Sequence, residues 1–132
     1  GSASRAGALA GVENARLVSA PPETAADPVG SLDASRARRL DRTARLATVA
    51  VQLAGAGADD GVVLGTAFGD ADGSAAFLHK AFEKGPRMAP PADFPNLVPS
   101  SPVGHASIYL GLHGPALATA DLASSGESAF VT

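Results

Sequence analysis

The residues best placed to do chemistry lie in one stretch near the end of the sequence, between Gly114 and Ser128. A Gly-Pro turn precedes Ala116–Ala120, a short run of small and mainly apolar residues that is typical of a strand buried on both faces. Residues 124–128 then carry turn and helix-cap signals. A strand that bends sharply into a helix presents one side chain and several free amide N–H groups at a single point, where enzymes often hold a nucleophile. This bend is the candidate site.

The nucleophiles available at the bend are serines, because the chain contains no cysteine. Ser124 or Ser125 could serve a hydrolase, but the G-x-S-x-G spacing is not met, since Leu122 and Ala123 stand where a glycine is needed. Capping the last helix is the stronger interpretation of both serines. The histidines of the chain are interpreted as structural, and not as catalytic bases. They are His79, His105 and His113.

The composition narrows the classes of function. The 132 residues are 45% apolar, which suits one small domain with its own core. A formal net charge of −3 argues against nucleic acid as a partner. No apolar run approaches the roughly 18 residues of a membrane helix, and no secretory signal is recognisable, so we expect a cytoplasmic protein without membrane contact. Without cysteine there is no thiolate metal site, and we expect neither a metal nor a cofactor.

A long helix is expected from about Ala34 to Ala54, with Asp33 as its N-cap. Its second half is apolar almost all round, whereas its first half is basic. The arginines are Arg36, Arg38, Arg39, Arg42 and Arg45. One interpretation of them is a solvated face with i,i+4 partners, such as Asp41 with Arg45. The other is a patch that docks an acidic carrier protein.

Strand and helix patterns alternate between this helix and the candidate site. Val62–Thr66 is expected to form a short buried strand. Ala75–Lys84 is expected to form a helix that is capped by Asp72 or Ser74 and stopped by Gly85-Pro86.

A proline-rich span covers residues 86–102, with six prolines. We expect an ordered wrapping loop, because apolar anchors interrupt the prolines. These anchors are Met88, Phe94, Leu97 and Val98. A helix over Val103–Leu112 follows. The resulting order of elements is an α/β layout, in which two clear strands are too few to make a satisfied sheet alone.

The two ends of the chain are less regular than its middle. Residues 1–30 form a poorly defined N-terminal segment, in which residues 12–18 show the partial alternation of a strand. At the other end, an apolar helical pattern runs to Thr132 without a C-cap signal. We therefore expect the sequence to be cut from something longer.

Four segments in a fixed order carry a family resemblance. Ser35–Ala47 contains an arginine–hydrophobic–aspartate–arginine pattern, and Val63–Thr66 is similar to a core strand that follows such a helix. Phe94–Ile108 has an "FPN…P…S-I" pattern, and Gly111–Pro115 is similar to "GLKGP". Together they resemble the N-terminal half of the β-ketoacyl synthases. The resemblance implies an α/β domain over residues 31–132 that is half of a thiolase-like layered αβαβα fold.

The resemblance also implies roles for the strand and the bend. The strand would lie at the interface of a dimer and pair with its mate across the two-fold axis. Its residues are Ala116, Leu117, Ala118, Thr119 and Ala120. In the family, the nucleophilic cysteine stands three residues before the glycine of the bend, so Ala123 would occupy that position ahead of Gly126. An alanine methyl group cannot attack a carbonyl. Asp121 and Glu127 also depart from the family pattern, and their carboxylates would repel an anionic malonyl thioester.

Two hypotheses follow from this resemblance. The first is a non-catalytic subunit or fragment of fatty acid or polyketide biosynthesis, similar to a chain-length factor. It would pair with a second ketosynthase-type chain, complete the fold and shape the acyl site. The second is a fragment or Cys-to-Ala variant of an active β-ketoacyl-ACP synthase, which catalyses decarboxylative Claisen condensation. Asp121 and Glu127 favour the first hypothesis, and an acyl carrier protein is a further partner to be expected for either.

Overall fold

The protein is described by a computed structural model that covers residues 31–131. The N-terminal segment of residues 1–30, including the strand expected over 12–18, and Thr132 lie outside the described residues. In chain order the elements are α3 (Ala34–Ala37), α4 (Arg42–Ala54), β1 (Val62–Gly65), α5 (Ala71–Lys84), η1 (Pro86–Met88), η2 (Pro91–Leu97), α6 (Ser101–Leu110), β2 (Ala116–Thr119), η3 (Leu122–Ser124) and α7 (Ser125–Val131), where η marks a 3-10 helix. The mixture of helix and sheet confirms the α/β class, and the thiolase-like arrangement stays a prediction.

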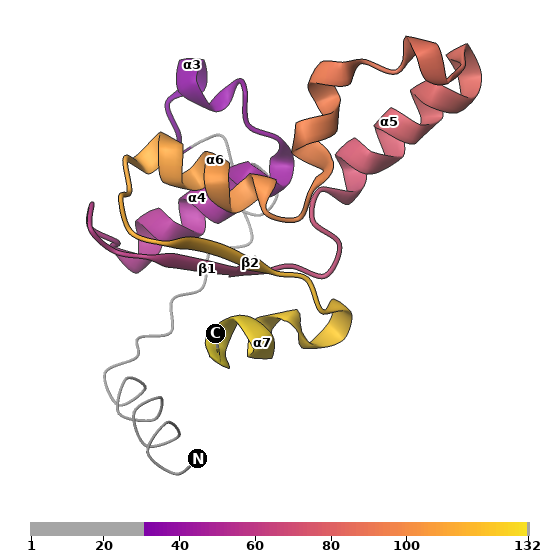
Figure 1. Ribbon diagram of the computed structural model, residues 1–132. Helices are drawn as coiled ribbons and strands as arrows, with labels where there is room; N and C mark the ends of the chain where they lie inside the picture. Colours follow the sequence, from indigo (N-terminus) through magenta and orange to yellow (C-terminus); the bar gives the residue numbers. More distant parts are fainter. Residues whose placement is uncertain (1–30, 132) are drawn as a thin grey trace.

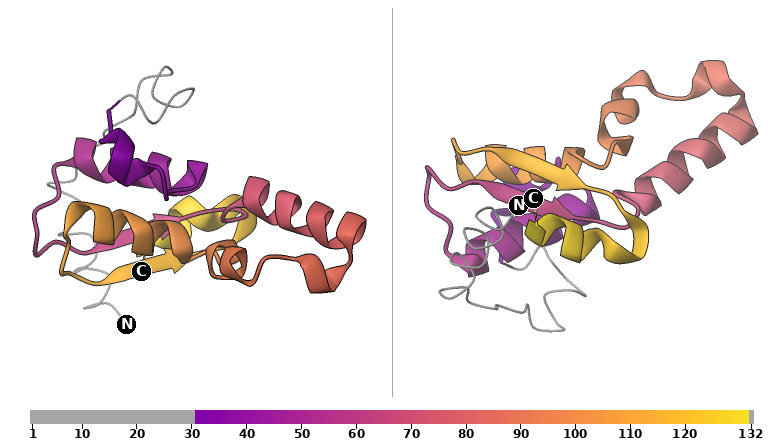
Figure 2. Two further views of the ribbon diagram at one scale, coloured as in Figure 1. Left: turned by 90° about the horizontal axis from the view of Figure 1, so that it is seen from above. Right: turned by 60° about the horizontal axis from the view of Figure 1, so that its bottom comes forward.

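The two strands form a parallel sheet with helices on both faces (Figure 1). Val62 lies opposite Ala116, and Gly65 lies opposite Thr119. Helices α4 and α6 pack together on one face, and α7 packs on the other (Figures 1 and 2). Parallel strands require a long crossover connection, which here runs through α5, the two 3-10 helices and α6.

The long helix expected over residues 34–54 is broken, and that prediction was wrong. Asp41 takes an extended backbone (φ −67°, ψ 173°), and its carboxylate accepts a hydrogen bond from the Ala44 N–H at 2.7 Å. It therefore caps a new helix, while Leu40 beside it turns into the core. No ion pair joins Asp41 and Arg45 in the described part of the chain. The Arg45 Nε instead donates to the Ala37 carbonyl at 3.3 Å.

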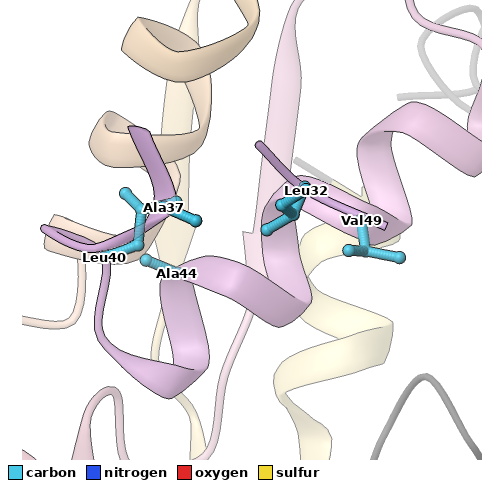
Figure 3. Packing of buried hydrophobic residues seen from close by; sticks show 5 residues of the cluster. All are labelled: Leu32, Ala37, Leu40, Ala44 and Val49. Carbon is cyan, nitrogen blue, oxygen red and sulfur yellow. The ribbon is translucent and has the colours of Figure 1, made fainter. Parts of the chain in front are cut away.

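The core lies between α3, α4 and α6. Figure 3 shows its central cluster, which consists of Leu32, Ala37, Leu40, Ala44 and Val49. Tyr109 of α6 packs against this cluster. Val103 and Ala106 of α6 are 2% and 0% exposed. The small side chains let α4 and α6 approach closely, so these helices share a buried core.

Two glycines end the helices of this layer. Gly55 takes a left-handed backbone (φ +76°) and ends α4 where the sequence indicated. Gly111 (φ +67°) likewise ends α6 at Leu110. Helix α6 thus begins and ends two residues before the expected range of 103–112.

Helix α5 leads away from the sheet and forms a projecting arm with η1 and η2 (Figures 1 and 2). It begins at Ala71, because the Asp70 carboxylate accepts a hydrogen bond from the Gly73 N–H at 3.1 Å. The expected caps, Asp72 and Ser74, were therefore wrong. Both fall inside the first turn of the helix.

The proline-rich span is ordered as the two 3-10 helices of the arm, but it does not wrap over the core. Three of its four expected anchors were wrong, because they are exposed: Met88, Phe94 and Val98. The span is instead held to α5. The rings of Phe94 and Phe77 lie 6.3 Å apart, and Lys80 pairs with Asp93 at 3.4 Å.

Strand β2 lies where the sequence indicated, but it is not buried on both faces in this chain. Ala116 and Leu117 are exposed, Leu117 by 47%, whereas Ala118 and Thr119 are partly buried. The reason is that the sheet of the described residues has only two strands. One edge of β2 pairs with β1, and no strand within residues 31–131 lies beside its other edge.

Candidate functional site

The candidate site is the bend that joins β2 to α7 through η3. Leu122 stands at its start with a φ of +47°, and it is the only non-glycine residue of the described chain with a positive φ. A side chain in this region costs on the order of 1–3 kcal/mol, so the surrounding contacts must hold it. Strained turns of this kind are where nucleophile elbows place their reactive residue. By backbone geometry, the apex of the bend is Leu122.

Ser125 supplies the contacts that hold the bend. Its side chain is buried, and the hydroxyl lies 2.8 Å from the carbonyl of Thr66 and 2.7 Å from that of Leu122. The same oxygen accepts the Asp121 N–H at 3.0 Å. The Thr119 hydroxyl donates to the Ser125 carbonyl at 3.2 Å. Ser125 therefore ties the bend to the carboxyl ends of both strands.

A close backbone approach brings α7 onto β1. A Cβ atom at Gly65 would lie 2.4 Å from the Ser125 carbonyl oxygen. No real side chain tolerates that distance, so glycine is required at this position of the strand. Gly65 and Ser125 together fix where the helix begins.

Polar side chains surround the bend on its outer side. The Ser124 hydroxyl donates to the Asp121 carbonyl at 3.1 Å, and the Ser128 hydroxyl donates to the Asp121 carboxylate at 2.8 Å. A shallow open hollow of about 430 Å³ is lined by Ser124, Glu127, Ser128 and Val131. The structure thus brings Asp121 and Glu127 to the bend, where they add negative charge.

Ala123, which the resemblance would place at the position of the family cysteine, is exposed and lies inside η3, directly after Leu122. The sequence did not single out Leu122 as the apex, because leucine carries no signal for a left-handed backbone. Only the observed φ reveals it. Both residues at the start of the bend are aliphatic.

The histidines of the described chain are not brought to the bend. His79 and Glu83 lie 3.3 Å apart on the exposed face of α5. His105 belongs to α6, on the opposite face of the sheet (Figure 1). His113 precedes β2, and its backbone N–H donates to the Ala58 carbonyl. No hydrogen bond of residues 31–131 joins a histidine to either serine of the bend.

The same range, residues 31–131, contains no group of histidine, aspartate and glutamate that could hold a metal ion. None of its helices has the length and hydropathy needed to cross a membrane. No protein-family model matches the chain, and no curated protein matches it either. The comparisons therefore assign no function to the bend, and its chemistry has to be inferred from its geometry alone.

Proposed function

We propose that the chain is a non-catalytic subunit or fragment similar to a β-ketoacyl synthase, which pairs with a second ketosynthase-type chain. One observation carries the proposal. The strained start of the bend is occupied by Leu122 and then Ala123, and neither side chain can attack a thioester carbonyl. The conclusion is the same whichever of the two residues aligns with the family cysteine.

The serines of the bend do not replace the missing nucleophile. A serine needs a neighbouring base to become reactive. The Ser125 hydroxyl is buried, lies within hydrogen-bond distance of two backbone carbonyls and accepts a hydrogen bond from one backbone N–H. The Ser124 hydroxyl donates to the Asp121 carbonyl. Both hydroxyls thus serve the backbone of the bend, in keeping with a scaffold and not with an acyl-enzyme.

Two carboxylates favour this proposal over a Cys-to-Ala variant of an active synthase. Asp121 and Glu127 lie at the bend and bring negative charge to the place where the anionic malonyl thioester of a condensing enzyme would react. Like charges at short range disfavour such a substrate. A cysteine in place of Ala123 would leave this repulsion unchanged.

The open edge of β2 supports pairing with a second chain. A sheet of two strands is marginal by itself, and an unpaired edge is a template for another strand. Leu117 and Ala116 are exposed on this strand. Pairing with the equivalent strand of a cytoplasmic ketosynthase-type partner would cover them. Such a pair would receive its acyl groups from a carrier protein.

Covalent loading tests the absence of chemistry. The chain is incubated with radiolabelled malonyl and acyl thioesters, and intact mass is measured; we expect no adduct. An adduct on Ser124 or Ser125 would overturn the proposal. The variant Ala123→Cys carries the only thiol of the chain, and Leu117→Cys measures the background rate of an exposed thiol. We expect both variants to load at the background rate, whereas fast loading of Ala123→Cys would favour the active-synthase alternative.

Light scattering tests the pairing. The chain is measured alone and mixed with a full-length ketosynthase-type chain. We expect a complex that Leu117→Lys abolishes. The matched variant Leu53→Lys changes a leucine of α4 that is 42% exposed, close to the 47% of Leu117, and should keep the complex. A monomer in every mixture would contradict the pairing.

A further inference from the structure

A second cavity is lined by residues of α3, α6 and the turn that follows α3. Both helices lie on the face of the sheet opposite α7 (Figure 1). Its volume is about 450 Å³, a size that suits a small-molecule ligand. Three arginines and a histidine line it together with apolar side chains, and no aspartate or glutamate of residues 31–131 belongs to its lining. The residues that matter are Arg36, Arg38, Arg39, His105, Ile108 and Tyr109. In a chain with a net charge of −3, this is a local concentration of positive charge.

Arg36 is held in place before any ligand arrives. Its guanidinium lies 4.3 Å from the centre of the Tyr109 ring and donates to the Tyr109 carbonyl. The Tyr109 hydroxyl accepts the Asp33 N–H at 2.9 Å. The Asp33 carboxylate accepts from the Ser35 hydroxyl and the Arg36 N–H, so it is engaged outside the cavity lining. This arrangement fixes one cationic wall of the cavity.

The other two arginines of the lining have no ionic partner among the described residues. Arg38 and Arg39 are exposed, and within residues 31–131 neither forms an ion pair or a hydrogen bond through its side chain. The Nδ1 atom of His105 is buried and has no hydrogen-bond partner there. The cationic groups that a ligand in the cavity can reach are therefore the exposed guanidinium groups of Arg38 and Arg39.

We infer that this cavity binds a phosphorylated small molecule. Arginine forks match the oxygens of a phosphate in paired hydrogen bonds, and Arg38 and Arg39 are available for this. Ile108 is 79% exposed beside them and offers a wall for an apolar part of the ligand. The binding site goes beyond the proposed function and does not depend on it.

A concave site favours a small molecule over an acidic protein surface. The phosphate would enter between the arginines, and its substituent would lie against Ile108 and Tyr109. An acidic carrier protein would instead require a broad exposed face. Docking of an acidic polypeptide is therefore an outcome that the experiment has to separate.

Tyr109 provides the readout, because it is the only tyrosine and the chain has no tryptophan. Its emission is followed during titration with butyl phosphate, a transparent ester with an apolar chain. Titrations with 1-butanol, inorganic phosphate and polyglutamate run in parallel. We expect saturable binding of butyl phosphate, weaker binding of inorganic phosphate and no response to 1-butanol or polyglutamate.

Substitutions decide whether the site is the cavity. Arg38→Gln and Arg39→Gln should each weaken butyl phosphate binding by about tenfold, the loss expected for one charge-assisted contact. Arg87→Gln removes the same charge from the arm, outside the lining, and should leave binding unchanged. Circular dichroism checks that all three variants fold. The inference is overturned if butyl phosphate does not bind, if Arg87→Gln weakens binding equally, or if polyglutamate alone binds.

Discussion

The layer of α4 and α6 and the arm of α5 differ in how many of their apolar side chains are buried. In the layer, Ala44, Val103 and Ala106 are at most 2% exposed and pack against one another's helices. In the arm, Leu78 and Phe82 are 53% and 86% exposed. No residue of α5 is fully buried. The layer therefore contains a buried core, although Leu53 of α4 and Ile108 of α6 are exposed on its outside, whereas α5 has no buried residue at all.

This difference is in keeping with the proposed pairing with a second chain. Large exposed apolar groups on a stable scaffold are typical of surfaces that a partner covers. The open edge of β2 belongs to the same uncovered set as the arm, since Leu117 is 47% exposed. Stability of the isolated chain should therefore depend on the layer and on the sheet contacts, and hardly on the arm.

The largest effect is expected from Gly65→Ala, which breaks the contact between β1 and α7. The new Cβ would lie 2.4 Å from the Ser125 carbonyl oxygen, so the backbone of the bend must move. We expect the free energy of unfolding to fall by about 3 kcal/mol. Urea unfolding followed by circular dichroism measures it.

Gly104→Ala is the matched control for that substitution. Gly104 lies within α6, and a Cβ there would meet nothing within 4 Å. Alanine is the better helix former, so this variant should gain about 0.5–1 kcal/mol. Equal stability of the two variants would contradict the close packing of α7 on β1.

Much of the fold could be predicted from the sequence because local signals decided it. The two strands and the ends of α4 and α5 follow from short apolar runs and from glycines. The break before α4 could not be read in this way. Five arginines and a continuous apolar pattern favour one helix, but burial of Leu40 and the cap at Asp41 divide it. Tertiary packing decided that boundary, and propensity did not.

The candidate site was only partly accessible from the sequence. The order strand, bend and helix was expected from Ala116 to Ser128, and the structure has it. The strained backbone of Leu122 and the buried hydroxyl of Ser125 depend on contacts with Thr66, 59 residues earlier than Ser125. A contact at that sequence separation leaves no local pattern. The arginine-lined cavity was likewise hidden, because its walls come from α3 and α6.

A pair of truncations tests the contrast between layer and arm directly. Val103→Ala removes buried volume between α6 and α4 and should cost about 2 kcal/mol of unfolding free energy. Phe82→Ala removes a larger side chain that is 86% exposed, and its effect should stay within about 0.5 kcal/mol. Urea unfolding of both variants gives the comparison. A larger loss for Phe82→Ala would show that the isolated chain already buries its arm.

An effect smaller than that of Val103→Ala is expected at the joint between the two regions, where Asp70 caps α5. Its side chain is buried, and this burial is the main cause that raises the pKa of the carboxyl. The carboxylates of Asp41 and Asp72 raise the pKa further, against the hydrogen bond from the Gly73 N–H. Because the folded-state pKa lies above the unfolded one, folding favours the protonated group. The contribution of Asp70 to the free energy of unfolding therefore rises as the pH falls through the folded-state pKa and is lost as the pH rises through it.

Asp70→Asn tests this sign, because asparagine keeps the capping acceptor and removes the charge. At neutral pH the variant should be more stable than the original chain, by less than the change expected at Val103. The difference should shrink as the pH is lowered through the pKa of Asp70, which urea unfolding at a series of pH values would follow. Asp72→Asn, in the exposed first turn of α5, removes the same charge without relieving burial and should give no such gain. If Asp70→Asn proves less stable at neutral pH, the buried charge supports the joint, and the arm is fastened to the layer more firmly than its exposed surface implies.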